Sequence, residues 1–139
     1  MKKAILSLII CTFVLALVIG CTKEEVSEES MLSRIETSLK AQGFTVVSEG
    51  RQSSDNLEQV YPYKYKIKQN EMNEDYLLIY IFSSKDLVNK GISNQHYNIT
   101  TLTKFKNYIN KNVLVVHFAS EGNLDKYKQK LEEAISKIS

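Results

Sequence analysis

The sequence is poor in several residue types on which enzymes and metal sites depend. Its 139 residues include two cysteines, two histidines, one proline and no tryptophan. Because the cysteines are Cys11 and Cys21, the chain beyond Cys21 can form no disulfide framework, thiolate nucleophile or cysteine zinc site. Only five glycines are present, and no phosphate-binding, dinucleotide or Gly-x-Ser-x-Gly motif occurs. We therefore predict no cofactor, no metal and no catalytic residue.

The two histidines do not form a recognisable pair in the sequence. His117 alternates with Val113 and Val115 in a β-prone run, and His96 lies in a polar segment. Neither has a partner at the spacing of a metal-binding motif. We interpret His117 as a strand histidine and His96 as solvent-exposed. A small enzyme or metal-binding protein that uses His117, His96 and turn carboxylates is the alternative.

The N-terminal segment carries the most specific signal in the chain. Lys2 and Lys3 precede an apolar run over residues 4–18, which is shorter than the roughly 20 residues of a spanning helix. The run leads into Val-Ile-Gly-Cys at residues 18–21 and resembles the signal peptide and lipobox of bacterial lipoproteins. The resemblance implies export, cleavage between Gly20 and Cys21, and lipidation of the Cys21 thiol. An uncleaved N-terminal membrane anchor is the alternative, with the same extracytoplasmic orientation.

The predicted domain boundaries follow from this signal. Residues 1–20 form the removed signal peptide, residues 21–30 a lipidated and acidic tether, and residues 31–139 a single domain. The alternative is that the tether glutamates begin the first helix. Without residues 1–20 the chain has 119 residues, with 16 basic and 16 acidic side chains. A neutral chain gives no electrostatic reason to expect nucleic-acid binding.

Apolar patterning predicts the order of the secondary structure. We expect helices over residues 31–42 and 84–89 and from residue 124 onward, and strands over residues 44–48, 63–68, 75–82, 105–109 and 113–119. Gly91 is expected to end the middle helix, and residues 110–112 to form a hairpin turn. This order predicts an α+β fold with one twisted, mostly antiparallel sheet of about five strands and two to three helices packed on one face.

Tyrosine and lysine alternate around the second predicted strand. Alternating aromatic and cationic side chains can stack on and attract anionic polymers, and exposed tyrosines suit a protein interface. The alternative places the tyrosines in the core and the lysines on a solvated face. The candidate binding surface comprises Tyr61, Tyr63, Lys64, Lys66 and Lys68.

The pattern as a whole resembles small lipoproteins of unknown function from Gram-positive bacilli. The residues that carry the resemblance are the lipobox, the run 77–84 and the run 111–116 before a C-terminal helix. The resemblance implies no activity. The sequence therefore favours a non-catalytic domain, held to the cell membrane on the extracytoplasmic side through lipid on Cys21. It is expected to bind another envelope component, with a protein as the favoured partner. A small-solute-binding lipoprotein is a further alternative; 119 residues is small for the usual two-lobed receptors, and a large tyrosine-lined cleft would favour it.

Overall fold

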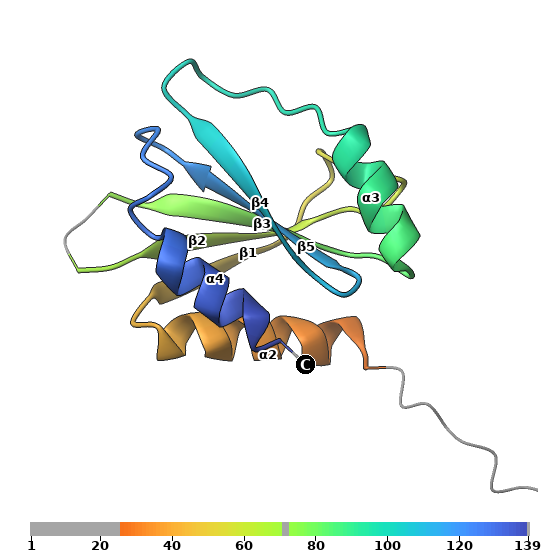
Figure 1. Ribbon diagram of the computed structural model, residues 1–139, viewed down its shortest axis with the longest axis horizontal. Helices are drawn as coiled ribbons and strands as arrows, with labels where there is room; N and C mark the ends of the chain where they lie inside the picture. Colours follow the sequence, from red (N-terminus) through yellow and green to blue (C-terminus); the bar gives the residue numbers. More distant parts are fainter. Residues whose placement is uncertain (1–25, 71–72, 139) are drawn as a thin grey trace, which may run out of the picture.

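The structure is built on one β-sheet with helices on both sides (Figure 1). The computed structural model describes residues 26–70 and 73–138. In chain order the elements are α2 (Glu28–Ala41), β1 (Thr45–Arg51), β2 (Tyr63–Lys68), β3 (Asp75–Ile81), α3 (Lys85–Ser93), β4 (Lys104–Asn110), β5 (Val113–Ala119) and α4 (Lys128–Ser136). Within these described residues, no helix has the length and apolar character needed to cross a bilayer.

The five strands lie in the order β1-β2-β3-β5-β4, and each neighbouring pair is antiparallel. The chain forms a three-stranded meander, leaves the sheet through α3, and returns as the β4–β5 hairpin with β5 beside β3. The hairpin turn at Lys111 and Asn112 begins with Lys111 in the left-handed region, at φ 54°. This arrangement confirms the predicted α+β fold with an antiparallel sheet of five strands.

Residue alternation accounts for the two faces of β2. Tyr65 and Ile67 are buried on the side of α2, and Lys64 and Lys66 project from the other side. Because successive side chains of a strand point to opposite faces, one row is buried and the other stays partly in contact with water. The neighbouring β1 contains a bulge at Ser48–Gly50. Gly50 has a φ angle of 77° there, which glycine adopts easily because it has no Cβ atom.

The central strands β3 and β5 are covered on both faces because they are apolar on both faces. Leu77 and Ile79 point to the α2 and α4 side, and Leu78 and Tyr80 point to the α3 side. Every residue of β5 is buried. The sheet therefore separates two hydrophobic clusters, one under each layer of covering segments.

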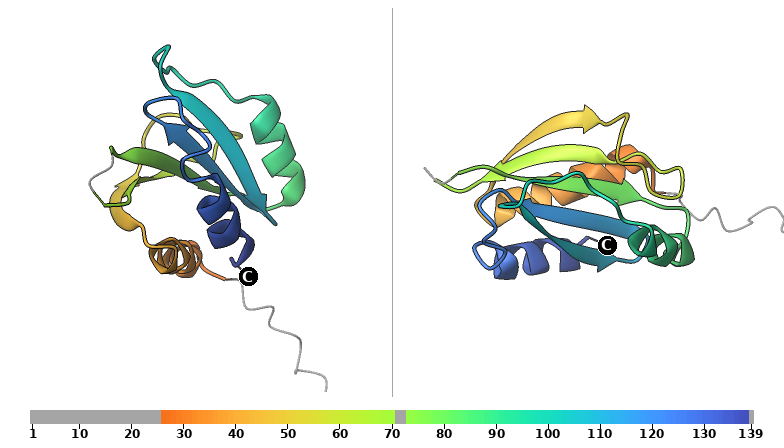
Figure 2. Two further views of the ribbon diagram at one scale, coloured as in Figure 1. Left: turned by 60° about the vertical axis from the view of Figure 1, so that its left-hand side comes forward. Right: turned by 90° about the horizontal axis from the view of Figure 1, so that it is seen from above.

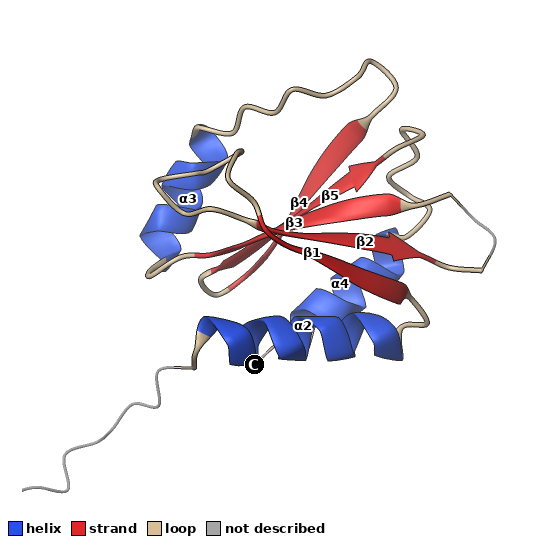
Figure 3. Ribbon diagram, turned by 180° about the vertical axis from the view of Figure 1, so that it is seen from behind, coloured by secondary structure: helices blue, strands red, loops and turns tan. Residues whose placement is uncertain are grey.

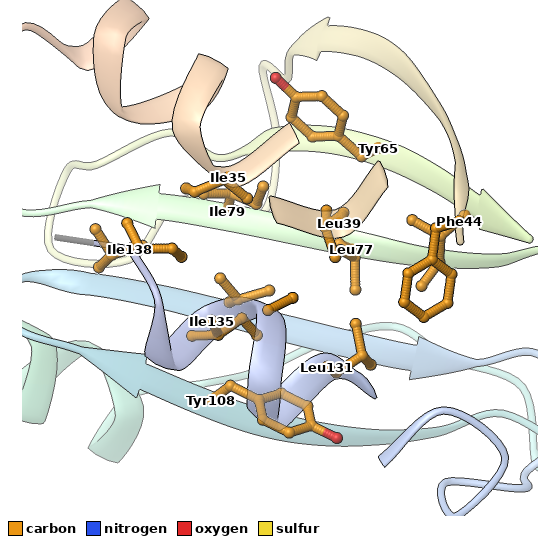
Figure 4. Close-up of a cluster of buried hydrophobic side chains, with 14 of the residues drawn as sticks. Ile35, Leu39, Phe44, Tyr65, Leu77, Ile79, Tyr108, Leu131, Ile135 and Ile138 are labelled. Atoms are coloured by element: carbon orange, nitrogen blue, oxygen red, sulfur yellow. The ribbon is translucent and has the colours of Figure 1, made fainter. Parts of the chain in front are cut away.

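The larger core lies between the sheet and helices α2 and α4, which pack against each other (Figure 4). Ile35 and Leu39 of α2 meet Leu131 and Ile135 of α4 over the strand side chains. Each of these four residues is at most 3% exposed. Burying such a side chain stabilises the folded state by roughly 1.5–3 kcal/mol.

Helix α2 begins three residues earlier than predicted. Ser27 caps it by accepting a hydrogen bond from the Ser30 main-chain nitrogen at 3.2 Å, and Glu28 and Glu29 occupy the first turn. Carboxylates at this position interact favourably with the helix dipole. The predicted tether over residues 21–30 is thus too long at its C-terminal end, and the alternative in which the glutamates begin the helix holds for residues 28–30.

Helix α3 lies on the opposite side of the sheet from α2 (Figure 3). It packs toward β5 and is seen beside the β4–β5 half of the sheet in Figure 2. The expectation of two to three helices on one face is therefore correct for α2 and α4 but does not extend to α3. The reason is that β3 and β5 carry apolar residues on both faces, so each face requires cover.

Two helix boundaries also differ from the prediction. Helix α3 continues through Gly91 to Ser93, because Gly91 is a close-packing position beside Phe82 rather than a helix end. Helix α4 begins at Lys128 rather than near residue 124. The Asn123 side chain accepts hydrogen bonds from the main-chain nitrogens of residues 125 and 126, which holds this segment in a turn before the helix.

Candidate functional site

The residues that carry the lipoprotein prediction, Gly20 and Cys21, lie outside the described residues. The first described residue is Val26. Together with Lys111 and Asn112 of the β4–β5 turn, Val26 lines an open hollow of about 870 Å³. The N-terminal end of the described chain therefore lies beside that turn, where a tether from Cys21 would join the domain.

The structure separates the five residues of the candidate binding surface. Tyr63 points to the side of α2, where its hydroxyl donates to the Glu28 carboxylate at 2.9 Å. Burial and this hydrogen bond raise the pKa of Tyr63. Tyr61 precedes β2 and is 39% exposed next to Arg51. Tyr63 is thus on the opposite side of the sheet from the β2 lysines, and Tyr61 lies beyond the start of the strand.

The three lysines of β2 share one face, and two of them are paired. The Nζ atoms of Lys64 and Lys66 lie 3.0 and 2.8 Å from the two carboxylate oxygens of Glu49 on β1. Hydrogen bonds from Lys66 and then Lys64 hold the pKa of Glu49 below its ordinary value. Lys68 follows on the same face and is half-buried. This face therefore carries three cations against the single Glu49 carboxylate and keeps an excess of positive charge, although two of the cations are paired.

The two histidines do not come together. His117 is fully buried on the α2 and α4 side, with its ring centroid 6.3 Å from that of Tyr127. His96 is exposed in the loop after α3, and the adjacent Tyr97 packs on the opposite side of the sheet. Among residues 26–70 and 73–138, no group of three or more histidine, cysteine or acidic side chains is placed to hold a metal ion.

His117 instead belongs to an enclosed ionic cluster. Its Nε2 atom lies 3.0 Å from Oδ2 of Asp75, whose other oxygen accepts from the Ser120 main-chain nitrogen at 3.0 Å. The Lys126 ammonium lies 3.7 Å from Oδ2. Burial opposes ionisation of Asp75, but the hydrogen bonds from His117 and Ser120 outweigh it and lower the pKa of Asp75. The cluster fixes the turn before α4 to β3 and β5.

An aromatic cavity that the sequence does not predict opens on the α3 side of the sheet. We call it the aromatic pocket. Its volume is about 210 Å³. The strands contribute Lys64, Tyr76, Leu78 and Phe118 to its walls, and two loops contribute residues 52, 54, 55 and 97–99. Of the five candidate surface residues, Lys64 alone lines this cavity.

The aromatic rings of the pocket form a corner. Tyr76 stacks on Phe118 with ring centroids 4.6 Å apart and planes 8° from parallel. Tyr97 meets Phe118 edge-on, at 5.0 Å and 82°. The Lys64 ammonium lies 5.2 Å from the centre of the Tyr76 ring. Two ring planes thus meet nearly at right angles, with a cation at one side.

A hydrogen-bond network fixes the two loops around the pocket. The Tyr97 hydroxyl donates to the Tyr80 hydroxyl at 3.2 Å, and Tyr80 donates to the main-chain oxygen of Asp55 at 2.7 Å. Gln95 and Asn107 exchange two amide hydrogen bonds, and Gln95 also donates to Tyr97. Burial raises the pKa values of Tyr80 and Tyr97, so both hydroxyls remain protonated at neutral pH.

The loop over residues 52–62 has an unusual backbone. Asp55, Glu58 and Gln59 have φ angles of 57°, 49° and 66°, a region that residues with a side chain rarely adopt. Glu58 and Gln59 form the centre of a tight turn, closed by reciprocal main-chain hydrogen bonds between Leu57 and Val60. Leu57 is 4% exposed in the α3-side core. Its burial holds this conformation at the edge of the pocket.

The sequence contained only a weak signal for this site. Tyr97 and Ile99 alternate, but they lie in a segment that forms no strand. Their partners Tyr80 and Phe118 belong to strands that come together only in the folded sheet. Comparisons with protein families, curated proteins and solved structures found no match to this chain.

Proposed function

We propose that this chain is a lipid-anchored domain on the extracytoplasmic side of the cell membrane, which binds another envelope component without catalysing a reaction on it. A protein is the favoured partner. The lipobox at residues 18–21 supports the anchor and the location. The membrane contact is the lipid on Cys21, and a balanced charge gives no reason to expect a nucleic-acid partner.

One observation supports binding rather than catalysis most directly. Asp75 and His117, the residue types that would serve as a catalytic pair, are 2% and 0% exposed. A substrate cannot reach either group without unfolding the segment that covers them. The side chains that do face outward around the aromatic pocket are aromatic, amide and paired charged groups. These groups are suited to recognition.

The position of the pocket fits an anchored binding domain. The described chain starts beside the β4–β5 turn, and Val113 begins β5 at that turn. Phe118 of the pocket lies five residues further along β5, about 17 Å at roughly 3.3 Å per residue. If the domain is tethered near the β4–β5 turn, the aromatic pocket therefore lies toward the opposite end of the domain, away from the membrane surface.

The test is site-specific photocrosslinking in living cells. A photoreactive amino acid is placed at Asn98 on the pocket rim or at Gln129, which is exposed on α4. We expect an envelope protein to be captured from Asn98, not from Gln129, and to be lost with Cys21→Ser. Capture from both positions, capture that persists without the anchor, or no capture from Asn98 would each contradict the proposal.

A second candidate is a lipoprotein that binds a small solute. The aromatic pocket itself favours it, because Tyr76 and Tyr97 line a concave site with polar groups at its margin. If this candidate is correct, the photoreactive group at Asn98 should capture no protein. The purified protein should instead retain or bind a small ligand.

A further inference from the structure

The charges around the aromatic pocket are already compensated. Two cations, Lys64 and Lys66, share the Glu49 carboxylate, and Asp55 contributes a second carboxylate to the lining. An anion in the pocket would face the Asp55 carboxylate and would have to compete with Glu49 for the two lysines, and a cation would face the Lys64 ammonium. The arrangement therefore favours a ligand without net charge.

The walls of the pocket favour a ring with an apolar face. Tyr76 is covered on one face by the parallel Phe118 ring and has the Lys64 ammonium over its ring at 5.2 Å. Tyr97 stands almost perpendicular to that plane. Leu78 and Ile99 complete the apolar lining. The negative face of an aromatic ring attracts polarised C–H groups, so the axial hydrogens of a saturated ring can take the place of the Lys64 ammonium over Tyr76, while Lys64 keeps its ion pair with Glu49.

The polar groups of the pocket can both donate and accept hydrogen bonds. Asn98 is exposed, and its side-chain amide has no partner among the described residues. The Tyr76 hydroxyl is also without a partner in the described part of the chain. The Ser54 hydroxyl donates to one oxygen of Asp55, which leaves the other oxygen as an acceptor. Hydroxyl groups, which donate and accept, match this mixture.

The volume limits the ligand to one small ring. About 210 Å³ is below the range of roughly 300–1,000 Å³ for sites of drug-sized molecules. It equals the liquid volume of roughly seven water molecules, at about 30 Å³ each. We propose that the aromatic pocket binds a single pyranose ring of a neutral saccharide. This inference rests on the proposed function in treating the chain as a binding domain, but it does not depend on the anchor or on a protein partner.

The pyranose ring can belong to a free sugar or to a wall polysaccharide. The test uses the processed, lipidated protein in detergent, with binding measured by ligand-observed NMR and by calorimetry. The probes are glucose, N-acetylglucosamine and a tetramer of N-acetylglucosamine, with choline and inorganic phosphate as ionic probes. We expect at least one sugar to bind at millimolar concentration or below. Tetramer binding at least about tenfold tighter than the monomer identifies a polymer as the source, and equal binding identifies the free sugar.

Two variants locate the site without threatening the fold. Tyr76→Leu keeps Phe118 covered but removes the stacking platform, and Asn98→Ala removes an exposed amide. Each should weaken sugar binding by about tenfold, which corresponds to about 1.4 kcal/mol. Tyr61→Ala, which changes an exposed tyrosine outside the pocket, is the matched control and should bind as the parent does.

Three outcomes would overturn the saccharide assignment. They are binding of choline or phosphate in place of every sugar, no sugar binding at all, and sugar binding that is unchanged in both pocket variants. The two proposals can fail separately. If sugars do not bind but Asn98 still captures an anchor-dependent partner, the proposed function stands and only the ligand class is wrong.

Discussion

Oδ2 of Asp75 lies 3.0 Å from Nε2 of His117, and the two side chains are 2% and 0% exposed. An ionised carboxylate can only accept a hydrogen bond, so Nε2 of His117 is the donor to Asp75. The two residues come from adjacent strands, β3 and β5. Asp75 also accepts from the Ser120 main-chain nitrogen, and Lys126 lies near the same carboxylate. One buried carboxylate therefore ties the sheet to the segment that leads into α4.

Asp75→Asn should destabilise the protein at neutral pH and much less in acid. The pKa of Asp75 is lowered in the folded state, so its contribution is complete above the unfolded value of about 3.9 and disappears as the pH falls through the folded value. Removing one partner of a buried charge cluster costs about 3–5 kcal/mol. Urea unfolding of both proteins at pH 7 and at a series of pH values below 4 measures this difference.

Asp125→Asn is the matched control for that series. Asp125 is exposed, so its substitution should change the free energy of unfolding by less than about 0.5 kcal/mol. A constant difference between Asp75→Asn and the parent at all pH values would show that the loss comes from packing and not from ionisation.

Gly91→Ala should destabilise the protein although alanine is the better helix former. A Cβ atom at position 91 would lie 2.9 Å from Cζ of Phe82, which is 2% exposed and closely packed. Overpacking of this kind costs about 1–3 kcal/mol, more than the roughly 1 kcal/mol of helix propensity gained. Thermal or urea unfolding measures the difference.

A double-mutant cycle with Phe82→Leu separates the two effects. Shortening residue 82 removes the atom that the new Cβ would meet, so Gly91→Ala should become neutral or stabilising in that background. If Gly91→Ala destabilises the protein equally with phenylalanine and with leucine at position 82, contact with Phe82 is not the cause of the destabilisation.

The strands could be predicted from the sequence because their cause is local. The alternation from Tyr63 to Lys68 gives β2 its two faces, and the apolar run around Val115 gives a central strand. The shared face of Val113, Val115 and His117 is confirmed as well. Gly91 was predicted wrongly because a glycine that ends a helix and one that permits close packing look alike in the sequence.

The aromatic pocket could not be predicted because its geometry is set by contacts between distant segments. Tyr97 is positioned by the Tyr80 hydroxyl and by the Phe118 ring, and neither contact leaves a periodic pattern. The side of the sheet on which α3 packs could not be predicted for a similar reason. It depends on which side of the sheet remains uncovered after α2 and α4 pack, which is decided by the whole fold.

The Glu49 carboxyl should titrate below its usual range, and the two lysines should contribute unequally. The hydrogen bond from Lys66 is the larger cause and that from Lys64 the second. Lys66→Gln should therefore raise the pKa of Glu49 more than Lys64→Gln does. Carboxyl-detected NMR titration of the parent and both variants measures the order. Lys68→Gln changes a lysine on the same face that makes no ion pair with Glu49, and it should leave the titration nearly unchanged.

Tyr80 and Tyr108 should respond oppositely to removal of the hydroxyl group. Both side chains are buried, but Tyr80 donates to Asp55 and accepts from Tyr97, whereas the Tyr108 hydroxyl has no partner in the described residues. Burial, together with Glu132 and Asp125, raises the pKa of Tyr108 to about 12, so its hydroxyl remains neutral and unpaired.

Tyr80→Phe should therefore lower the free energy of unfolding by about 0.5–1.5 kcal/mol, because it removes the hydrogen bonds to the main-chain oxygen of Asp55 and from the half-buried Tyr97 hydroxyl. Tyr108→Phe removes an unsatisfied group and should be neutral or stabilising by up to about 1 kcal/mol. Both substitutions delete the same oxygen atom from the same residue type. The change in the free energy of transferring the side chain from water to the protein interior is therefore the same for both and cancels in the comparison. Urea unfolding at neutral pH gives both values. Destabilisation of Tyr108→Phe by as much as Tyr80→Phe would mean that the Tyr108 hydroxyl has a partner in solution, such as a buried water, and that its burial is compensated.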